Sequence, residues 1–336
     1  MATGWSVDDQ VASPVVDVFS SSPQAPGRTD ATAHGAGRGV GIGIGIGLLS
    51  AAAFSTSGTF GTSLIGAGWS PLAAVVVRVS IAALVLTIPA LLQLRGRWAS
   101  LRRHAWRTTG FGLVGVAACQ VCYFNALERM PVGIALLLEY LAVVMIVVWL
   151  WLRHGQRPRP LTVTGGVGAL GGLALMLNLT GAGGISVAGL IWGLLAAVSL
   201  TVYFFLSASV TGEPLPPVVM TWGSMIVGAV ALGLVGLTGL MPMRFSGAAV
   251  TLFGDRVSWI VSVAGLSVIA AAFAYVAGIG AARRLGAKLA SFVAMAEILF
   301  AVLFAWVLLG QVPTATQFAG GALILGGVVL VRLDEA

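Results

Sequence analysis

One stretch of the chain decides the fold: YFNALERMPVGIALLLEYLAVVMIVVWLWLRHGQRP, residues Tyr123–Pro158. Between Val132 and Leu152 this stretch is apolar apart from Tyr140 and a single charge, Glu139. A helix of about 20 apolar residues is long enough to cross the hydrocarbon core of a membrane. Turn residues at Met130-Pro131 and at Pro158–Pro160 bound the run. The stretch therefore predicts a transmembrane helix with one acidic side chain inside it.

A second stretch, GIGAARRLGAKLASFVAMAEILFAVLFAWVLLGQVP at Gly278–Pro313, matches the first at an offset of 155 residues. Between Ala126–Pro158 and Ala281–Pro313, 8 of 33 aligned positions are identical, including a Gly-Gln-x-Pro end in both. If each copy belongs to a half of five helices, the second half enters the membrane from the opposite face, because five is odd. Inverted repeats of this kind are typical of transporters that bind substrate between their halves.

The whole chain has the composition of a membrane protein. Of its 336 residues, 58% are hydrophobic and 9% are charged, and the mean hydropathy is +1.00. Soluble domains carry about 25% charged residues, so this composition excludes a soluble enzyme and a disordered protein. We predict an all-α integral membrane protein of ten transmembrane helices, arranged as two inverted five-helix repeats. The predicted spans are 40–63, 71–94, 108–127, 132–152, 160–180, 184–207, 216–239, 257–280, 287–309 and 314–332.

Residues 1–38 differ from everything that follows. They contain four of the 11 acidic residues and the Ser-rich run Ser20–Pro23, with no basic segment leading into an apolar one. Such a segment is not a signal peptide, and it cannot bury enough apolar surface to fold. We predict a disordered cytoplasmic tail at 1–38, a first repeat at 39–182 and a second repeat at 183–333.

Basic residues gather on one side of the predicted membrane. Fourteen of the 18 Lys and Arg fall in the tail, the C-terminus and alternate loops, against Arg129, Arg244 and Arg256 in the other loops. Because positively charged loops stay in the cytoplasm, we predict a multi-pass protein of the plasma (inner) membrane with both termini cytoplasmic. The net charge of +7 thus indicates topology and does not point to nucleic acid.

The five-plus-five arrangement resembles the drug/metabolite transporter superfamily, and within it the EamA family of exporters. The resemblance rests on Arg78 in VVVRVSIAALVL (75–86) and on the two stretches quoted above, and it covers about residues 40–332. Relatives often end helices 4 and 9 on Glu, whereas this chain has Gln156 and Gln311 there. The resemblance implies export of amino acids or related small metabolites.

Three ionisable side chains lie inside the predicted spans, where a charge costs about 2.5–3.5 kcal/mol. Arg78 and Glu139 each lie seven residues into their helices from the outer face, about 10 Å deep, so they can pair. That pair either binds a zwitterionic substrate or orients two helices. Glu297 lies about 15 Å deep, near the midplane, and is either a proton or amine site or a carboxyl that makes a polar contact in the core.

Further polar and aromatic residues are candidates for a binding pocket. Gln120 and Tyr123 share one helix face at i, i+3, and Ser55–Thr59 lie at similar depth. Trp192 and Trp222 are candidate aromatic walls. For the hydroxyls, hydrogen bonding within or between helices is the alternative, and for the tryptophans it is packing. The predicted site is therefore Arg78, Gln120, Tyr123, Glu139, Glu297 and Trp192.

Three motifs that suggest other chemistry fail in context. GIGIGIG at Gly41–Gly47 follows no strand, so it indicates close helix packing rather than nucleotide binding. Cys119 and Cys122 have CxxC spacing, but they lie mid-helix without further metal ligands in the nearby sequence. The three histidines all fall in the tail or in loops, so a Ser-His catalytic pair is not expected.

We expect a secondary transporter that works by alternating access, without catalytic residues, metal or cofactor, with proton coupling through a buried carboxylate. Its expected partners are a small-molecule substrate and the lipid bilayer, and its expected state is monomer or homodimer. A multidrug or nucleotide-sugar carrier of the same superfamily is one alternative. An integral-membrane enzyme or a receptor-like scaffold is the alternative of a different class.

Overall fold

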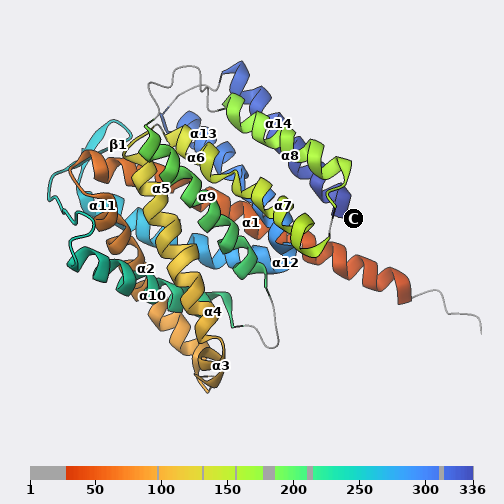
Figure 1. Ribbon diagram of the computed structural model, residues 1–336, viewed down its shortest axis with the longest axis horizontal. Helices are drawn as coiled ribbons and strands as arrows, with labels where there is room; N and C mark the ends of the chain where they lie inside the picture. Colours follow the sequence, from red (N-terminus) through yellow and green to blue (C-terminus); the bar gives the residue numbers. More distant parts are fainter. Residues whose placement is uncertain are drawn as a thin grey trace, which may run out of the picture. The chain divides into compact units, whose positions relative to one another are not determined.

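The computed structural model describes residues 28–96, 98–130, 132–155, 157–176, 186–209, 215–309 and 314–335. Within them, helices alternate with short connections along the chain (Figure 1). The elements are α1 (Arg28–Gly66), α2 (Pro71–Leu94), α3 (Trp98–Arg103), α4 (Ala105–Gly110), η1 (Phe111–Ala118), α5 (Cys119–Leu127), α6 (Val132–Glu139), α7 (Ala142–His154), α8 (Pro160–Met176), α9 (Val187–Ala208), α10 (Pro217–Leu237), β1 (Val250–Leu252), β2 (Asp255–Val257), α11 (Trp259–Ala264), η3 (Gly265–Phe273), α12 (Ala274–Ala294), α13 (Ala296–Leu309) and α14 (Ala315–Glu335).

Eight helical runs in the described part of the chain are long and apolar enough to cross a membrane. They are Gly39–Gly66, Pro71–Leu94, Ala105–Leu127, Ile134–Arg153, Val187–Ala208, Pro217–Leu237, Trp259–Ala294 and Ala315–Asp334. The helix at Pro160–Leu175 is apolar but shorter. The predicted spans 257–280 and 287–309 correspond to Trp259–Ala294 together with α13. The protein is therefore a nearly all-helical membrane protein, and the count of ten spans stays a prediction.

The boundary between those two predicted spans lies at Gly286, inside α12. Its backbone has φ 75° and ψ 168°, which interrupts the helix. A positive φ costs glycine little because it has no Cβ. The chain therefore changes direction at Gly286, two residues after the basic pair Arg283-Arg284.

Residues 1–27 of the predicted tail lie outside the described residues, as do Gln156 and Gln311 of the two Gly-Gln-x-Pro ends. Helix α1 begins at Arg28, so residues 28–38 are helical where the sequence predicted a disordered tail. Each residue added to an existing helix gains a backbone hydrogen bond without a new nucleation cost. The apolar sequence from Val40 onward supplies that existing helix.

A small β-hairpin departs from the all-α prediction. Strands β1 and β2 pair antiparallel between α10 and α11, with Leu252 opposite Asp255. The two residues between them, Phe253 and Gly254, both have positive φ, at 53° and 90°. Such two-residue turns match the twist of paired strands. The side chains of Val250 and Leu252, both in β1, are buried. Local turn geometry and apolar burial therefore explain the hairpin.

Close helix packing at glycine is a recurrent feature. Helices α8 and α14 lie side by side (Figure 1), and a Cβ added to Gly172 would lie 2.5 Å from the carbonyl oxygen of Gly320. In the GIGIGIG run of α1, a Cβ on Gly43 would lie 2.8 Å from Leu285, and one on Gly47 would lie 2.9 Å from Val293. The prediction that this run serves close packing is confirmed.

Two pairs of helix irregularities recur at the offset of the sequence repeat. The α6–α7 helix is interrupted at Tyr140 and Leu141, and the α12–α13 helix is interrupted at Met295, which is 155 residues after Tyr140. The π-helical segments η1 and η3 end at Ala118 and Phe273, also 155 residues apart. π-Helical turns often occur at functional sites, and the cavity described next is lined by η1 through Gly115 and by residues at or beside both helix breaks, Tyr140, Ala294 and Glu297.

Candidate functional site

A cavity lies among α1, η1, α5, α6, α9, α12 and α13, which come from both halves of the sequence. It offers about 70 Å³ to the centres of water molecules. Four of the six residues predicted as a site line it, namely Gln120, Tyr123, Glu139 and Glu297.

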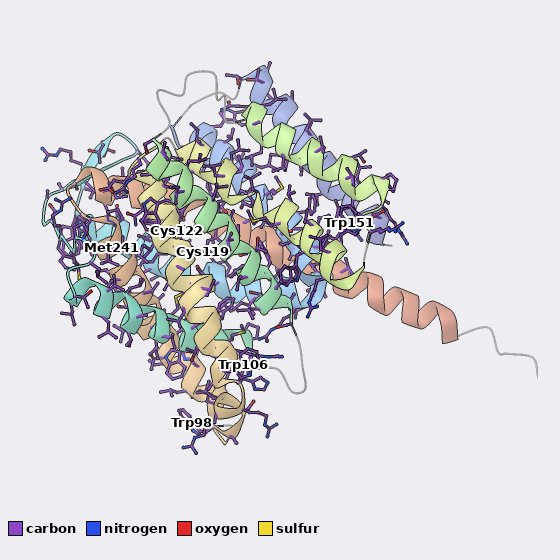
Figure 2. The ribbon with its side chains drawn as sticks, viewed as in Figure 1. Trp98, Trp106, Cys119, Cys122, Trp151 and Met241 are labelled. Atoms are coloured by element: carbon purple, nitrogen blue, oxygen red, sulfur yellow. The ribbon has the colours of Figure 1, made fainter. Side chains whose placement is uncertain are left out.

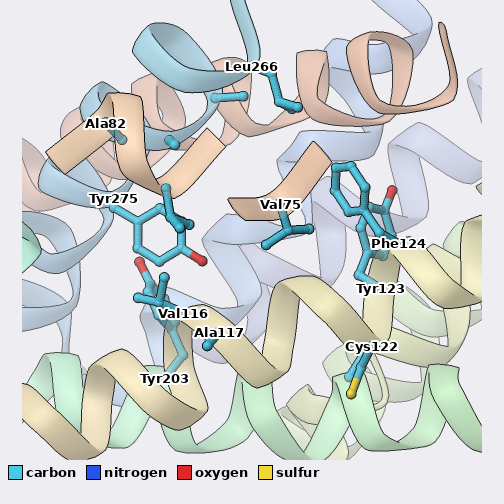
Figure 3. Close-up of a cluster of buried hydrophobic side chains, with 14 of the residues drawn as sticks. Val75, Ala82, Val116, Ala117, Cys122, Tyr123, Phe124, Tyr203, Leu266 and Tyr275 are labelled. Carbon is cyan, nitrogen blue, oxygen red and sulfur yellow. The ribbon is translucent and has the colours of Figure 1, made fainter. Parts of the chain in front are cut away.

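All four tyrosines of the chain line this cavity. They come from different elements: Tyr123 from α5, Tyr140 from the α6–α7 break, Tyr203 from α9 and Tyr275 from α12. Figure 3 shows Tyr203 and Tyr275 beside each other, and their ring centroids lie 5.6 Å apart at nearly perpendicular planes. Tyrosine combines a large apolar ring with a polar hydroxyl, so the cavity wall is aromatic with isolated hydrogen-bonding groups.

Arg78 lies behind the cavity wall, with 1% of its surface exposed. Its guanidinium donates to Ser57 Oγ at 3.0 Å, to Gln120 Oε1 and to the carbonyl oxygen of Ala270. These acceptors belong to α1, α5 and η3, so one side chain ties three elements together. Equal depth in the membrane allowed an ion pair between Arg78 and Glu139, but the hydrogen-bond partners of Arg78 are these neutral acceptors.

A directional chain of hydrogen bonds continues from Arg78. Gln120 accepts from Arg78 through its oxygen and donates through Nε2 to the hydroxyl of Tyr275 at 2.9 Å. Tyr275 in turn donates to the carbonyl oxygen of Gly115 at 3.3 Å. Gly115 and Ala270, whose carbonyls end the two branches, both lie in π-helical segments. Each donor meets an acceptor, so bonds in the chain strengthen one another in a low-dielectric interior.

The two carboxylates of the cavity have different partners. Glu297 Oε2 lies 2.7 Å from the hydroxyl of Tyr140. Glu139 Oε1 accepts only a weak thiol contact, at 3.6 Å from Cys119 Sγ. Neither carboxylate has a basic side chain within ion-pairing distance in the described part of the chain. The cavity therefore presents acidic groups that are open to a proton or to a cationic group of a ligand.

The remaining predictions for the site have mixed outcomes. Trp192 is half-buried in α9 and does not line the cavity; it lies eight residues, about 12 Å, before Leu200, the first residue of α9 that does. Trp222 donates to Thr87 Oγ1 at 3.0 Å, so it joins α10 to α2. Ser55 and Thr56 bond to carbonyls of their own helix, as the alternative interpretation predicted, whereas Ser57 lines the cavity.

The cysteines have no partner that indicates a metal. Cys119 and Cys122 lie among the helices, whereas Trp98 and Trp106 lie at one end of them (Figure 2). Both thiols are free and buried, and among the described residues no three His, Cys, Asp or Glu side chains are placed to hold an ion. Cys119 lines the cavity and so has a role that spacing alone did not indicate.

Sequence reasoning missed Tyr140, Tyr203 and Tyr275 as site residues. The available signal was their rarity: the chain has four tyrosines, and all fall inside predicted spans, where each hydroxyl needs a partner. Ser50, which lines the cavity and donates to the carbonyl oxygen of Ala274 at 2.8 Å, carried no such signal, because serines are common throughout the chain.

Comparisons with known proteins agree with the fold. The chain is 27% identical over 241 residues to an "Uncharacterized inner membrane transporter YicL" of Salmonella typhimurium (strain LT2), covering 70% of this chain and 75% of that protein. A solved structure titled only "Crystal structure of protein" has the same fold, with a TM-score of 0.68 at 22% identity, covering 87% of this chain and 98% of the other.

The family model named "EamA-like transporter family" matches the chain twice, at residues 41–178 and 187–333. The two matches together cover most of the chain, and each contains one of these helix breaks and one of these π-helical segments. The chain therefore belongs to the EamA-like transporter family of the drug/metabolite transporter superfamily, and it is a membrane transporter.

Proposed function

We propose that this transporter exports amino acids or closely related amine-bearing metabolites across the inner membrane by alternating access. One observation carries the proposal: the cavity between the two halves contains the carboxylates Glu139 and Glu297, and none of the described residues that line it is Lys, Arg or His. An ammonium group supplies the missing positive charge and three hydrogen-bond donors. Export is the direction that the family resemblance implies.

The repeat supports the mechanism. The helix breaks recur 155 residues apart and residues at or beside both line the cavity, the π-helical segments recur at the same offset, and the family model matches each half separately. We propose that the two halves are inverted five-helix repeats with both termini in the cytoplasm, and that rocking of one half against the other exposes the cavity to each side in turn. Close packing of helices at glycine, as between α8 and α14, permits such sliding.

A multidrug carrier for organic cations is a second candidate. Four tyrosines together with Phe54 and Phe204 line the cavity, and aromatic faces attract cations by about 0.5–2 kcal/mol. A nucleotide-sugar carrier has less support, because phosphates require cations, and Arg78 lies behind the wall with both terminal guanidinium nitrogens, Nη1 and Nη2, donating to protein acceptors.

The test is transport by the purified protein in liposomes, measured with a panel of labelled amino acids and with a labelled aromatic cation. We expect saturable flux of at least one amino acid, competed weakly by the aromatic cation, and a loss of about tenfold to 100-fold in Glu297→Gln, the effect of removing a hydrogen-bonded charge. Stronger flux of the aromatic cation supports the second candidate.

The matched control is Glu128→Gln, which neutralises a glutamate outside the cavity. Glu128 pairs with Arg129 at 2.8 Å, and both side chains are one-third exposed. We expect flux like that of the unaltered protein, because exposed ion pairs contribute about 0–1 kcal/mol. If no panel member is transported by a protein that is correctly inserted, the proposal is wrong.

A further inference from the structure

The hydroxyl of Tyr140 lies between two acceptors at the break of the opposite helix. Its oxygen is 2.7 Å from Glu297 Oε2 and 2.8 Å from the carbonyl oxygen of Ala294. Tyr140 belongs to the α6–α7 break, and both acceptors belong to the α12–α13 break. One side chain therefore connects the two interrupted helices, each of which belongs to a different half of the transporter.

The carbonyl of Ala294 needs a donor from outside its helix. The amide of Ile298, which would bond Ala294 in a regular helix, instead donates to the carbonyl oxygen of Met295 at 3.2 Å. A carbonyl without a donor inside a membrane costs free energy. Tyr140 is the side chain placed to supply that donor.

Counting hydrogens shows that the protonation state of Glu297 decides which acceptor is satisfied. A phenol has one hydrogen to donate, and its oxygen can also accept. If Glu297 is ionised, its carboxylate is the stronger acceptor and takes the hydrogen, so Ala294 is left without it. If Glu297 is protonated, its O–H donates to the Tyr140 oxygen, and Tyr140 donates to Ala294. Only the protonated form satisfies all three groups.

Building on the proposed function, we propose that Tyr140 is a positioning residue that couples protonation of Glu297 to the order of the α12–α13 break. When Glu297 takes up a proton from water, its new O–H donates to the Tyr140 oxygen, and the Tyr140 O–H turns to donate to the carbonyl oxygen of Ala294, which orders the break. When Glu297 returns that proton to water, the Tyr140 O–H turns back to the carboxylate, and the break loses this hydrogen bond. The O–H of Glu297 is the one covalent bond formed or broken, and Tyr140 keeps its own hydrogen throughout.

Other titratable and charged groups face Glu297 from the packed helices. They are Glu139 from α6, Tyr123 from α5, Arg78 from α2 and Tyr140 itself. Among the residues that the structure describes, Tyr140 alone hydrogen-bonds to Glu297. Glu139 is the one other carboxylate of this set, so it must be neutralised separately in the test.

The experiment is hydrogen–deuterium exchange of the full-length protein in nanodiscs at several pH values, read by mass spectrometry on peptides covering residues 290–300 and corrected for the chemical exchange rate. We expect protection of the amides at 295–299 to fall about threefold to tenfold as Glu297 deprotonates, the effect of one hydrogen bond. In Tyr140→Phe and in Glu297→Gln, protection should no longer depend on pH.

Two control variants remove a similar group without touching this contact. Tyr203→Phe removes another cavity hydroxyl, and Glu139→Gln removes the other cavity carboxylate; both should keep the pH dependence at 295–299. The proposal is wrong if Tyr140→Phe keeps that dependence, or if Glu139→Gln abolishes it. Because exchange requires no substrate, this result is independent of whether amino acids are transported, and Glu297→Gln provides a second test should Tyr140→Phe fold poorly.

Discussion

The two halves of the transporter share an architecture but differ in their polar chemistry. In the first half, the break is formed by Tyr140 and Leu141 after a glutamate, Glu139; in the second, Met295 follows Ala294, and the glutamate is Glu297. At the 155-residue offset, Glu139 corresponds to Ala294 and Glu297 to Ala142. The carboxylates therefore occupy different positions on equivalent helices.

Residues at equivalent positions of the two repeats also contact each other directly. Gln120 and Tyr275 are 155 residues apart, and Gln120 donates to Tyr275 at 2.9 Å. Gly115 and Ala270, at the same offset, offer their carbonyls to Tyr275 and Arg78. Backbone irregularities are thus common to both halves, whereas each half contributes different side chains. Both halves therefore supply residues to the cavity, and they differ in the side chains that they place there.

The largest expected effect separates the two carboxylates. Glu297→Gln should lower transport by about tenfold to 100-fold, because Glu297 has a strong hydrogen-bond partner in Tyr140. Glu139→Gln should lower it by less than about tenfold, because Glu139 has only the thiol of Cys119. Liposome flux at matched protein density measures both, and equal losses would remove the distinction between the halves.

A second effect is expected at Arg78, whose hydrogen bonds join elements of both halves. Arg78→Ala leaves acceptors on α1, α5 and η3 without a donor, which should destabilise the protein by about 3 kcal/mol. Arg78→Lys keeps the charge without the planar fork and should be less harmful to both folding and transport. Thermal unfolding in detergent and liposome flux test this order; equal loss of flux and poor expression in both would make Arg78 purely structural.

The smallest effect concerns the contact between equivalent positions. Gln120→Leu and Tyr275→Phe each break the same chain of hydrogen bonds. In a double-mutant cycle we expect a coupling of about 1 kcal/mol between them, measured as unfolding free energy in mixed micelles. Val121→Ala is the control, because Val121 is next to Gln120 but its side chain takes no part in these hydrogen bonds. It should combine additively with Tyr275→Phe.

Much of the fold was predictable because the membrane restricts the choices. Backbone groups in lipid must bond within helices, so the apolar runs and their turn residues place α2 at Pro71–Leu94 as predicted. The hairpin at 250–257 was not predictable from hydropathy, because it lies in a connection and depends on two residues of positive φ. The helical continuation over residues 28–38 depends on the helix that follows and not on its own composition.

Candidate site residues were predictable where burying that type of side chain in a membrane costs free energy. Arg78, Glu139 and Glu297 were identified because charges inside a membrane need partners, and Gln120 and Tyr123 because they share a helix face. Trp192 was wrong as a lining residue because periodicity gives the face of a helix but not its position along the cavity. Tyr140, Tyr203 and Tyr275 were missed because a tyrosine in an apolar run packs equally well against lipid, protein or a cavity.

By itself, the sequence determined that this chain crosses a membrane, where most of its helices lie and which charges are buried, since each follows from the cost of transferring polar groups into lipid. Only the tertiary structure decided the partners: Arg78 with Gln120 and Ala270, and Tyr140 with Glu297 and Ala294. Those contacts join residues 42 to 192 positions apart. The approach of such distant residues depends on how the helices of both halves pack, which no local pattern encodes.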